Sequence, residues 1–391
     1  MNFVIQIYMI ICVALIIFDI AFLVLKNLRG KKFGGKDSKT KDFLMKQFRQ
    51  YNAEKGFGKE LKFFLTKSIS KTKNLVVLQN VLEELDEHKS EIYLEIKPYI
   101  LNLITEYKGK SEYERAFYAY VVSCLSFEDE SPTEQFYKEF FSFLDSQSLY
   151  TFSNAMIGFY RFKDPYALNN AIKKVDEKGT FYHGKLFVDG LLEFNGDKQE
   201  LNQLMKENFF VYAPSTQVSI LNYFRQNGMD EGDFCFEVWQ NKDINEEVIY
   251  AAMRYFAKFP REESRQKFIT ILKNDDSNWI EQLLAIQGLT NYNDFMVRAV
   301  IKRKSTHPNW YIRTNAVGYL HDNGLDKHEI LEILRLFDHF TNDALLYHYR
   351  EDEETTSYIV KTIQRLEREK NEDTSWKPAV LQYQREGGLS V

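Results

Sequence analysis

The sequence is poor in the residues that build disulfide frameworks, tight turns and low-complexity segments. It has 3 cysteines, 7 prolines and 18 glycines among 391 residues. Cys12, Cys124 and Cys235 stand far apart, so their spacing signals neither a disulfide framework nor a structural zinc site. The low proline and glycine content excludes a collagenous or linker-type chain. The sequence also lacks an excess of basic side chains, because it has 51 Lys and Arg and 56 Asp and Glu. This balance of charge argues against general nucleic-acid binding.

Catalytic motifs are lacking as well. The sequence contains no Gly-x-Ser-x-Gly, His-Glu-x-x-His, Cys-x-x-Cys or calcium-loop pattern. The stretch from Gly30 to Lys36 imitates the start of a phosphate-binding loop, but Asp37 stands where Ser or Thr would hold magnesium. We therefore expect no catalytic residue, no cofactor and no metal, and a binding role rather than a reaction.

Aromatic residues, by contrast, are abundant: 32 Phe, 24 Tyr and 4 Trp. Most of them lie at the helical spacing of a buried face, as between Phe136 and Leu144, or at equivalent positions such as Tyr223-Phe224 and Tyr255-Phe256. We expect these rings to form a core rather than a ligand surface. The tryptophans are too scattered in the sequence to define a binding platform; they are Trp239, Trp279, Trp310 and Trp376.

The longest apolar run lies at the amino-terminal end of the sequence. Residues 3–25 include only two strongly polar side chains, Gln6 and Asp19, and would form a helix of about 34 Å. This length predicts a single transmembrane helix. A cleaved signal peptide is the alternative, but it would have a basic leading region and a shorter apolar core.

A basic segment, residues 26–41, follows this run. It holds seven basic side chains and one acid, so its net charge is +6. The whole chain has a net charge of −5, and removing this segment and Asp19 leaves −10 for residues 42–391. The positive-inside rule then predicts a single-pass plasma-membrane protein with its N-terminus outside and its C-terminal repeat domain in the cytoplasm. We expect the basic side chains to contact anionic lipid; they are Lys26, Arg29, Lys31, Lys32, Lys36, Lys39 and Lys41.

One face of the predicted transmembrane helix could meet a second such helix. An ionisable residue such as Asp19 is costly inside a membrane unless it finds a partner or water. Asp19 is either protonated or drawn toward the interface, or it contacts a partner helix. The residues that share its face at 4-3-4-3 spacing form a candidate partner seam: Tyr8, Cys12, Leu15, Asp19 and Phe22.

From residue 42 onward the pattern is helical. The segments 74–85, 91–104 and 329–337 place apolar residues at i, i+3, i+4 and i+7, and strand alternation is not sustained anywhere. Prolines at positions 132, 165, 214, 260 and 308 mark helix boundaries. Two proline intervals, 98–132 and 132–165, are 34 and 33 residues long, which suggests a repeat.

The repeat is clearest in residues 246–320. Ala252, Ala285 and Ala316 recur at intervals of 33 and 31 residues, each followed by larger apolar residues three and four positions later. This pattern is typical of a helix that packs closely on the neighbouring repeat.

These residues resemble the HEAT-like repeat proteins. The segment 309–320 (NWYIRTNAVGYL) looks like the second helix of such a repeat, and 275–280 (DDSNWI) looks like a second copy of its first turn. The resemblance implies a right-handed stack of antiparallel helix pairs whose concave surface binds partners. It also implies a structural role for Arg313, which matches the family's arginine. The predicted fold class is therefore all-α: a transmembrane helix (3–25), a basic linker (26–41) and a HEAT-like α-solenoid (42–391).

Two side-chain clusters in the last third of the chain are candidate sites. Five of the seven histidines lie there, but no two of them have the i, i+4 spacing of a metal site, so we expect exposed or hydrogen-bonded rings. A basic patch near a repeat junction could dock an acidic protein segment, an anionic lipid or a nucleotide-linked ligand, or it could be a solvated helix end. The patch consists of Arg298, Lys302, Arg303, Lys304 and Arg313.

Together these features predict a membrane-anchored cytoplasmic protein-binding scaffold, or an accessory subunit of a membrane assembly, with membrane-associated protein partners. One alternative is an accessory factor of a membrane glycosyltransferase or envelope-polysaccharide system. The resemblance also allows a HEAT-like enzyme such as a DNA glycosylase or a bilin lyase. The acidic charge of residues 42–391 disfavours DNA work, and we expect no nucleic-acid partner.

Overall fold

A computed structural model describes residues 38–372, apart from 86–87, 126, 128–131 and 180–181. All regular secondary structure in this part of the chain is helical. The chain divides into two compact units, Met1–Tyr212 and Ala213–Val391, which are described separately.

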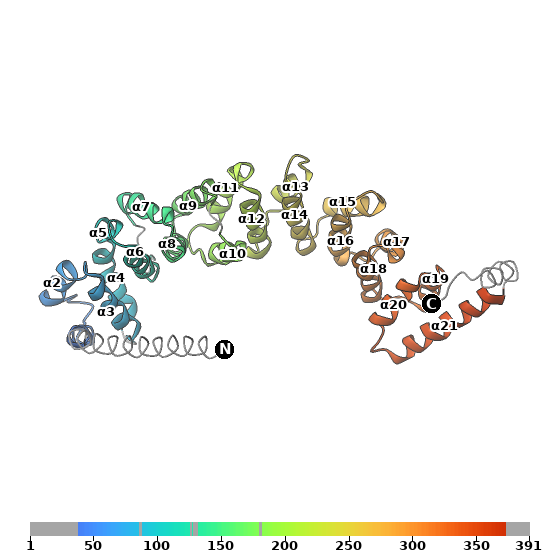
Figure 1. Cartoon of the computed structure of the whole chain (residues 1–391), viewed down its shortest axis with the longest axis horizontal. Helices are drawn as coiled ribbons and strands as arrows, with labels where there is room; N and C mark the ends of the chain where they lie inside the picture. Colours follow the sequence, from blue (N-terminus) through green and yellow to red (C-terminus); the bar gives the residue numbers. More distant parts are fainter. Residues whose placement is uncertain (1–37, 86–87, 126, 128–131, 180–181, 373–391) are drawn as a thin grey trace, which may run out of the picture. The chain divides into compact units, whose positions relative to one another are not determined.

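In unit 1 the helices form two rows (Figure 1). One row contains α3, α6, α8 and α10, and the other contains α5, α7, α9 and α11. The bounds are residues 38–49, α2 (Lys59–Lys67), α3 (Thr72–Glu83), α4 (Lys89–Leu101), α5 (Ile104–Lys108), α6 (Glu112–Ser123), α7 (Glu134–Phe140), η1 (Phe141–Asp145), α8 (Leu149–Arg161), α9 (Pro165–Glu177), α10 (Gly184–Glu193), α11 (Lys198–Glu207) and η2 (Phe209–Val211).

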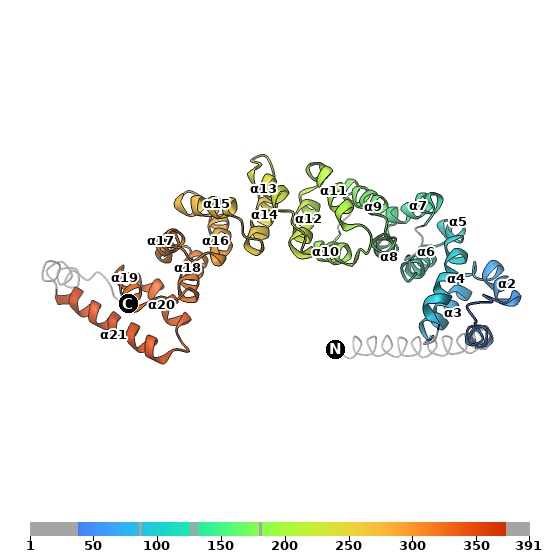
Figure 2. The ribbon, with the colours of Figure 1, turned by 180° about the vertical axis from the view of Figure 1, so that it is seen from behind.

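Unit 2 repeats this arrangement more regularly, as Figure 1 and Figure 2 show from opposite sides. The even-numbered helices from α12 to α20 pack in succession, and each odd-numbered helix from α13 to α19 packs on the even-numbered helix that follows it. The bounds are α12 (Pro214–Asn227), α13 (Gly232–Gln240), α14 (Glu246–Lys258), α15 (Glu262–Lys273), α16 (Trp279–Gly288), η3 (Leu289–Asn291), α17 (Phe295–Arg303), η4 (Lys304–Thr306), α18 (Trp310–Asp322), α19 (Lys327–Leu334), α20 (His339–His348) and α21 (Glu353–Glu372).

The predicted repeat of small residues is confirmed. Ala252, Ala285 and Ala316 are fully buried in α14, α16 and α18, which pack one on the next. The contact between rows is also close: a Cβ added at Gly288 of α16 would lie 2.3 Å from the ring of Phe268 on α15. Two packed rows of helices are compatible with a helical-repeat solenoid.

The predicted aromatic core is confirmed as well. Phe136, Phe140 and Phe143 are buried in unit 1, where neighbouring rings meet at 5.2–5.3 Å between centroids. The paired positions Tyr223-Phe224 and Tyr255-Phe256 are fully buried in α12 and α14. Burial of large rings at repeat-equivalent positions supplies much of the apolar area that joins the helices.

The predicted helix boundaries hold at all five prolines named for them. Pro165 and Pro214 occupy the first turns of α9 and α12, where a missing N–H leaves no intrahelical bond unmade. Pro98 lies inside α4. The predicted segment 91–104 is also not one helix, because α4 ends at Leu101 and α5 begins at Ile104.

The predicted fold class needs correction in one respect. None of the described helices is long and apolar enough to cross a membrane. Even α21, with 20 residues, carries acidic and basic side chains along its length. Within the described ranges the structure supports an all-α helical array. Residues 3–25, on which the prediction of that helix rested, lie outside the described residues.

Candidate functional site

The residues of the predicted basic patch lie near one another in unit 2, and most of them face carboxylates. Arg298 on α17 donates from Nη2 to both carboxylate oxygens of Glu329 on α19, at 2.7 Å each. These two side chains are only 19% and 26% exposed. Lys302, one turn later on α17, pairs with Glu332 of α19. The charges of Arg298 and Lys302 are therefore balanced inside the unit, and their docking role stays a prediction.

Arg303 and Lys304, where α17 runs into η4, share one acid. The Nζ of Lys304 lies 2.7 Å from Oδ1 of Asp275, and Nη2 of Arg303 lies 3.8 Å from its Oδ2. The Lys304 side chain is 3% exposed. Its hydrogen bond and charge lower the pKa of Asp275. This contact joins the end of α17 to the loop that follows α15.

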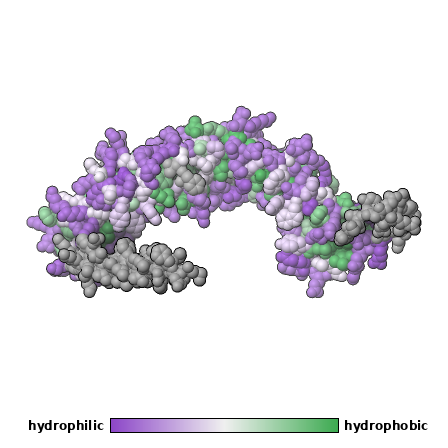
Figure 3. Space-filling model, viewed as in Figure 1, coloured by the Kyte–Doolittle hydropathy of each residue, from purple (hydrophilic) through white to green (hydrophobic). Residues whose placement is uncertain are grey.

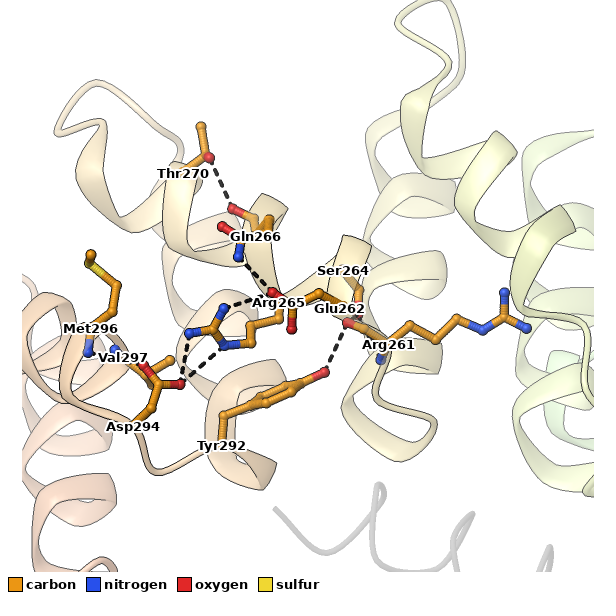
Figure 4. A network of polar contacts seen from close by, with 10 residues as sticks. All are labelled: Arg261, Glu262, Ser264, Arg265, Gln266, Thr270, Tyr292, Asp294, Met296 and Val297. Atoms are coloured by element: carbon orange, nitrogen blue, oxygen red, sulfur yellow. Dashed lines mark hydrogen bonds and ion pairs between the residues drawn. The ribbon is translucent and has the colours of Figure 1, made fainter.

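Arg298 belongs to a ladder of cation–carboxylate links along the odd-numbered helices. One step earlier, Arg265 of α15 donates from Nε and Nη2 to Oδ2 of Asp294, at 3.1 and 2.8 Å (Figure 4). Asp294 also caps α17 by accepting from the backbone N–H groups of residues 296 and 297. One step later, Lys327 of α19 pairs with Glu354 of α21 at 3.0 Å. Each cation thus reaches an acid at the start of the next odd-numbered helix.

Arg313, the last residue of the predicted patch, differs from the other four. It is 5% exposed on α18, and its Nη1 donates to the backbone oxygen of His307 at 2.8 Å. Its guanidinium carbon lies 4.8 Å from the centroid of the Phe340 ring on α20. Its Nε has no hydrogen-bond partner among the described residues, and no described carboxylate forms an ion pair with it. Arg313 is therefore a buried cation whose charge this part of the chain leaves unbalanced.

Four exposed aromatic residues lie at the starts of α16, α18 and α20, and we call them the aromatic strip. The exposed fractions are 44% for Trp279, 59% for Trp310, 54% for Tyr311 and 62% for Phe340. The rings of Trp279 and Tyr311 stack at 5.9 Å between centroids with an interplanar angle of 24°. Trp310 meets Tyr311 edge-on at 5.2 Å. The strip therefore continues across the starts of α16, α18 and α20.

Helix capping places the strip at this edge. Asn278, Asn309 and Asp338 precede α16, α18 and α20, and each side chain accepts a hydrogen bond from a backbone N–H of the first turn. Trp279 and Trp310 each directly follow the capping residue, and Phe340 follows it by two. The N-termini of these even-numbered helices, which are the positive ends of the helix dipoles, thus lie beside the exposed rings.

The arrangement has the composition of a binding surface. Large exposed aromatic residues are the typical anchors of protein interfaces. On an ordinary surface exposed apolar residues are scattered singly, whereas here several of them form a cluster. Leu336 and Phe337 lie just before α20, and their exposed fractions are 54% and 46%. Figure 3 shows apolar residues gathered on the visible surface around α20.

The histidines of unit 2 do not converge on one point. His321 and His348 come closest, with ring centroids 5.5 Å apart, and they line an open depression together with Arg350. Burial, followed by the charge of His321, lowers the pKa of His348. His328 and His339 are exposed and lie near acids of their own helices. Within the described ranges, no group of three or more His, Cys, Asp or Glu side chains could hold a metal.

The predicted transmembrane seam and most of the predicted lipid contacts lie outside the described residues. Of the lipid-contact residues, Lys39 and Lys41 are described. Lys39 is exposed in the helix at 38–49, and Nζ of Lys41 lies 2.6 Å from Oε1 of Glu84. Lipid contact by these residues stays a prediction.

The reasoning from sequence missed the strip because it treated the tryptophans as scattered. Trp279 and Trp310 are 31 residues apart, which is one repeat, so the fold brings them to the same edge. A signal was present: the dipeptide Asn-Trp occurs at 278–279 and again at 309–310. The ladder was also missed, although Arg265, Arg298 and Lys327 follow one another at intervals of 33 and 29 residues.

No protein-family model matches the chain, and no curated protein matches it. The fold and the geometry of the strip are therefore the features of the chain that bear on its function.

Proposed function

We propose that this chain is a protein-binding scaffold built on a HEAT-like helical repeat, and that the aromatic strip of unit 2 is its docking surface. The observation that carries the proposal is the strip itself. Its four rings come from three successive helices and are 44–62% exposed, whereas rings such as Tyr223 and Tyr255 are fully buried in the same row of helices. Exposure of this much apolar area is costly in water unless a partner covers it.

The HEAT-like part of the proposal has support in the packing. The even-numbered helices of unit 2 stack in one row with a small residue buried at each of three successive contacts, at intervals of 33 and 31 residues. A quasi-periodic array of this kind repeats its surface at each step. The strip is such a repeated feature, because it uses the first turn of each helix.

The partner, its membrane association and the cell-membrane location of the chain stay predictions, as does the role in envelope-polysaccharide assembly. The membrane association was predicted from residues 3–41, of which only 38–41 are described. The proposed scaffold needs only the strip and the rigid array behind it.

Site-specific photocrosslinking tests the proposal. A benzoylphenylalanine placed at Tyr311, in the middle of the strip, should crosslink one discrete partner in intact cells, because its ring would lie inside the interface. The matched control is the same group at Phe63 on α2, which is 68% exposed and lies outside the strip. A partner band from position 311 and none from position 63 is the expected result. Equal crosslinking patterns from the two positions would contradict the proposal.

A further inference from the structure

Arg313 is the feature of unit 2 that the fold alone does not explain. A guanidinium carries five N–H donors and a full charge, and removing it from water is costly unless acceptors and an anion compensate. Arg313 uses one donor on the oxygen of His307 and leaves Nε unpaired. Packing by Phe340 supplies a cation–π contact and no counter-ion.

The neighbouring cations do not share this condition. Arg298 has Glu329, Lys302 has Glu332, and the buried Lys304 has Asp275, as described above. The described side chains therefore supply one carboxylate for each of these cations and none for Arg313. The pKa of His307 is lowered first by burial and then by the charge of Lys304; Arg313 lowers it further, and Asp275 acts in the opposite direction.

The aromatic strip lies beside this cation, and its Phe340 ring contacts the guanidinium directly. Trp310 and Arg313 lie three residues apart on α18 and so share one side of the helix. The Phe340 ring covers the guanidinium and is itself 62% exposed. Turning an exposed ring is a fast side-chain motion, so an incoming group can reach the guanidinium beside it. The first turns of α18 and α20 add their positive ends at the same place.

We propose that the strip and Arg313 together bind a peptide segment of a partner protein that carries a large apolar side chain next to an Asp or Glu. The carboxylate pairs with Arg313, and the apolar side chain packs on Trp310, Tyr311 and Phe340. This inference rests on the proposed function and adds the chemistry of the partner.

A carboxylate fits this site better than a phosphate group does. Phosphopeptide sites use clusters of arginines, whereas Arg313 is one buried guanidinium with which no described carboxylate pairs. Its other neighbours are aromatic rings, which suit apolar side chains. One carboxylate therefore balances the charge, and the rest of the segment covers the strip.

The test is a selection of random twelve-residue peptides, displayed on phage, with the purified full chain. The expected outcome is enrichment of Asp or Glu beside Trp, Phe or Leu. A synthetic peptide of the enriched sequence should then bind Arg313→Gln about tenfold more weakly than the wild type, which is the size expected for a lost interfacial charge pair. Arg335→Gln, which alters an exposed arginine at the end of α19, is the matched control and should change affinity less than about twofold.

Three results would count against the inference, and they separate it from the proposed function. Enriched peptides without acidic residues would overturn the acidic partner and leave the docking surface standing. Equal binding to the wild type and Arg313→Gln would do the same. Enrichment that is no greater on the wild type than on a Trp310→Ser/Phe340→Ser variant would overturn both. If Arg313→Gln does not fold, the synthetic peptide with Asn or Gln in place of its acid provides the same comparison on the wild-type chain, again with a loss of about tenfold expected.

Discussion

The link between Arg298 and Glu329 offers a quantitative test of how successive helices are joined. Nη2 of Arg298 lies 2.7 Å from each carboxylate oxygen of Glu329, and the pair connects α17 to α19 across one repeat. Arg298 also donates to the backbone oxygen of Asn323 at 3.0 Å. Replacing Arg298 with Met removes all of these bonds, whereas Glu329→Gln removes the charge pairing and one of the two acceptor oxygens.

The expected cost follows from burial. Fully exposed ion pairs contribute about 0.2–1 kcal/mol, and breaking a fully buried pair costs about 3–5 kcal/mol. With side chains 19% and 26% exposed, this pair lies between these limits. We expect each single substitution to destabilise unit 2 by about 1.5–2.5 kcal/mol and the two to be coupled by about 1–2 kcal/mol. For a unit of this size, each kcal/mol corresponds to a fall in Tm of about 2–4 °C.

A double-mutant cycle measures the coupling. Urea unfolding of the wild type, the two single variants and the double variant gives the four free energies, and hydrogen exchange of α17 and α19 amides locates the change. The control cycle uses Lys327 and Glu354, which form the next step of the ladder but are 61% and 83% exposed. Because solvent screens that pair, we expect no measurable coupling there.

Two results would refute this reasoning. A coupling for Arg298 and Glu329 no larger than that of Lys327 and Glu354 would show that burial and the second hydrogen bond add nothing. A stabilising effect of Arg298→Met would show that desolvation of the pair outweighs its attraction.

Two further predictions concern packing and pH. Gly190→Ala in α10 should lower the free energy of unfolding of unit 1 by about 1–2 kcal/mol, because the added Cβ would lie 2.1 Å from the Tyr160 ring. The control is Gly109→Ala, whose added Cβ has no contact closer than 3.8 Å. In the same denaturation assay it should change the free energy of unfolding by less than about 0.5 kcal/mol. Burial and the charge of His321 lower the pKa of His348 below its usual 6.5, so the unfolded state binds the proton more readily. The stability that depends on neutral His348 is therefore present above about pH 6.5 and is lost as pH falls, and His348→Gln should reduce the loss measured between about pH 7.5 and about pH 5. An equal loss in the variant and the wild type would assign the pH dependence to other groups.

Helix type and repeat length could be predicted from the sequence because they depend on local patterns. The segments 74–85 and 329–337 correspond to α3 and α19, and the alanines at 252, 285 and 316 lie at helix contacts as expected. Periodicity and small-residue spacing are visible within a window of one repeat.

The site could not be predicted in the same way, because it depends on which residues the repeat brings side by side. Arg298 and Arg313 are both basic residues in the sequence, yet the fold gives the first a carboxylate partner and leaves the second without one. Trp310 occupies the first turn of a helix, where a ring stays exposed, whereas Trp239 lies at the buried end of α13. Exposure and pairing are tertiary properties, and composition alone does not reveal them.

The central claim, that the strip is a docking surface, is tested most directly by recovery of the crosslinked partner from cells that carry strip variants. The chain with Trp310→Ser and Phe340→Ser would be compared with the wild type, both carrying the photoreactive group at position 311, after their melting temperatures are shown to agree. Because both rings are more than half exposed, the variant should fold as the wild type does. The account predicts at least a tenfold loss of crosslinked partner, about the effect of removing two interface anchors. Recovery equal to that of the wild type would contradict it.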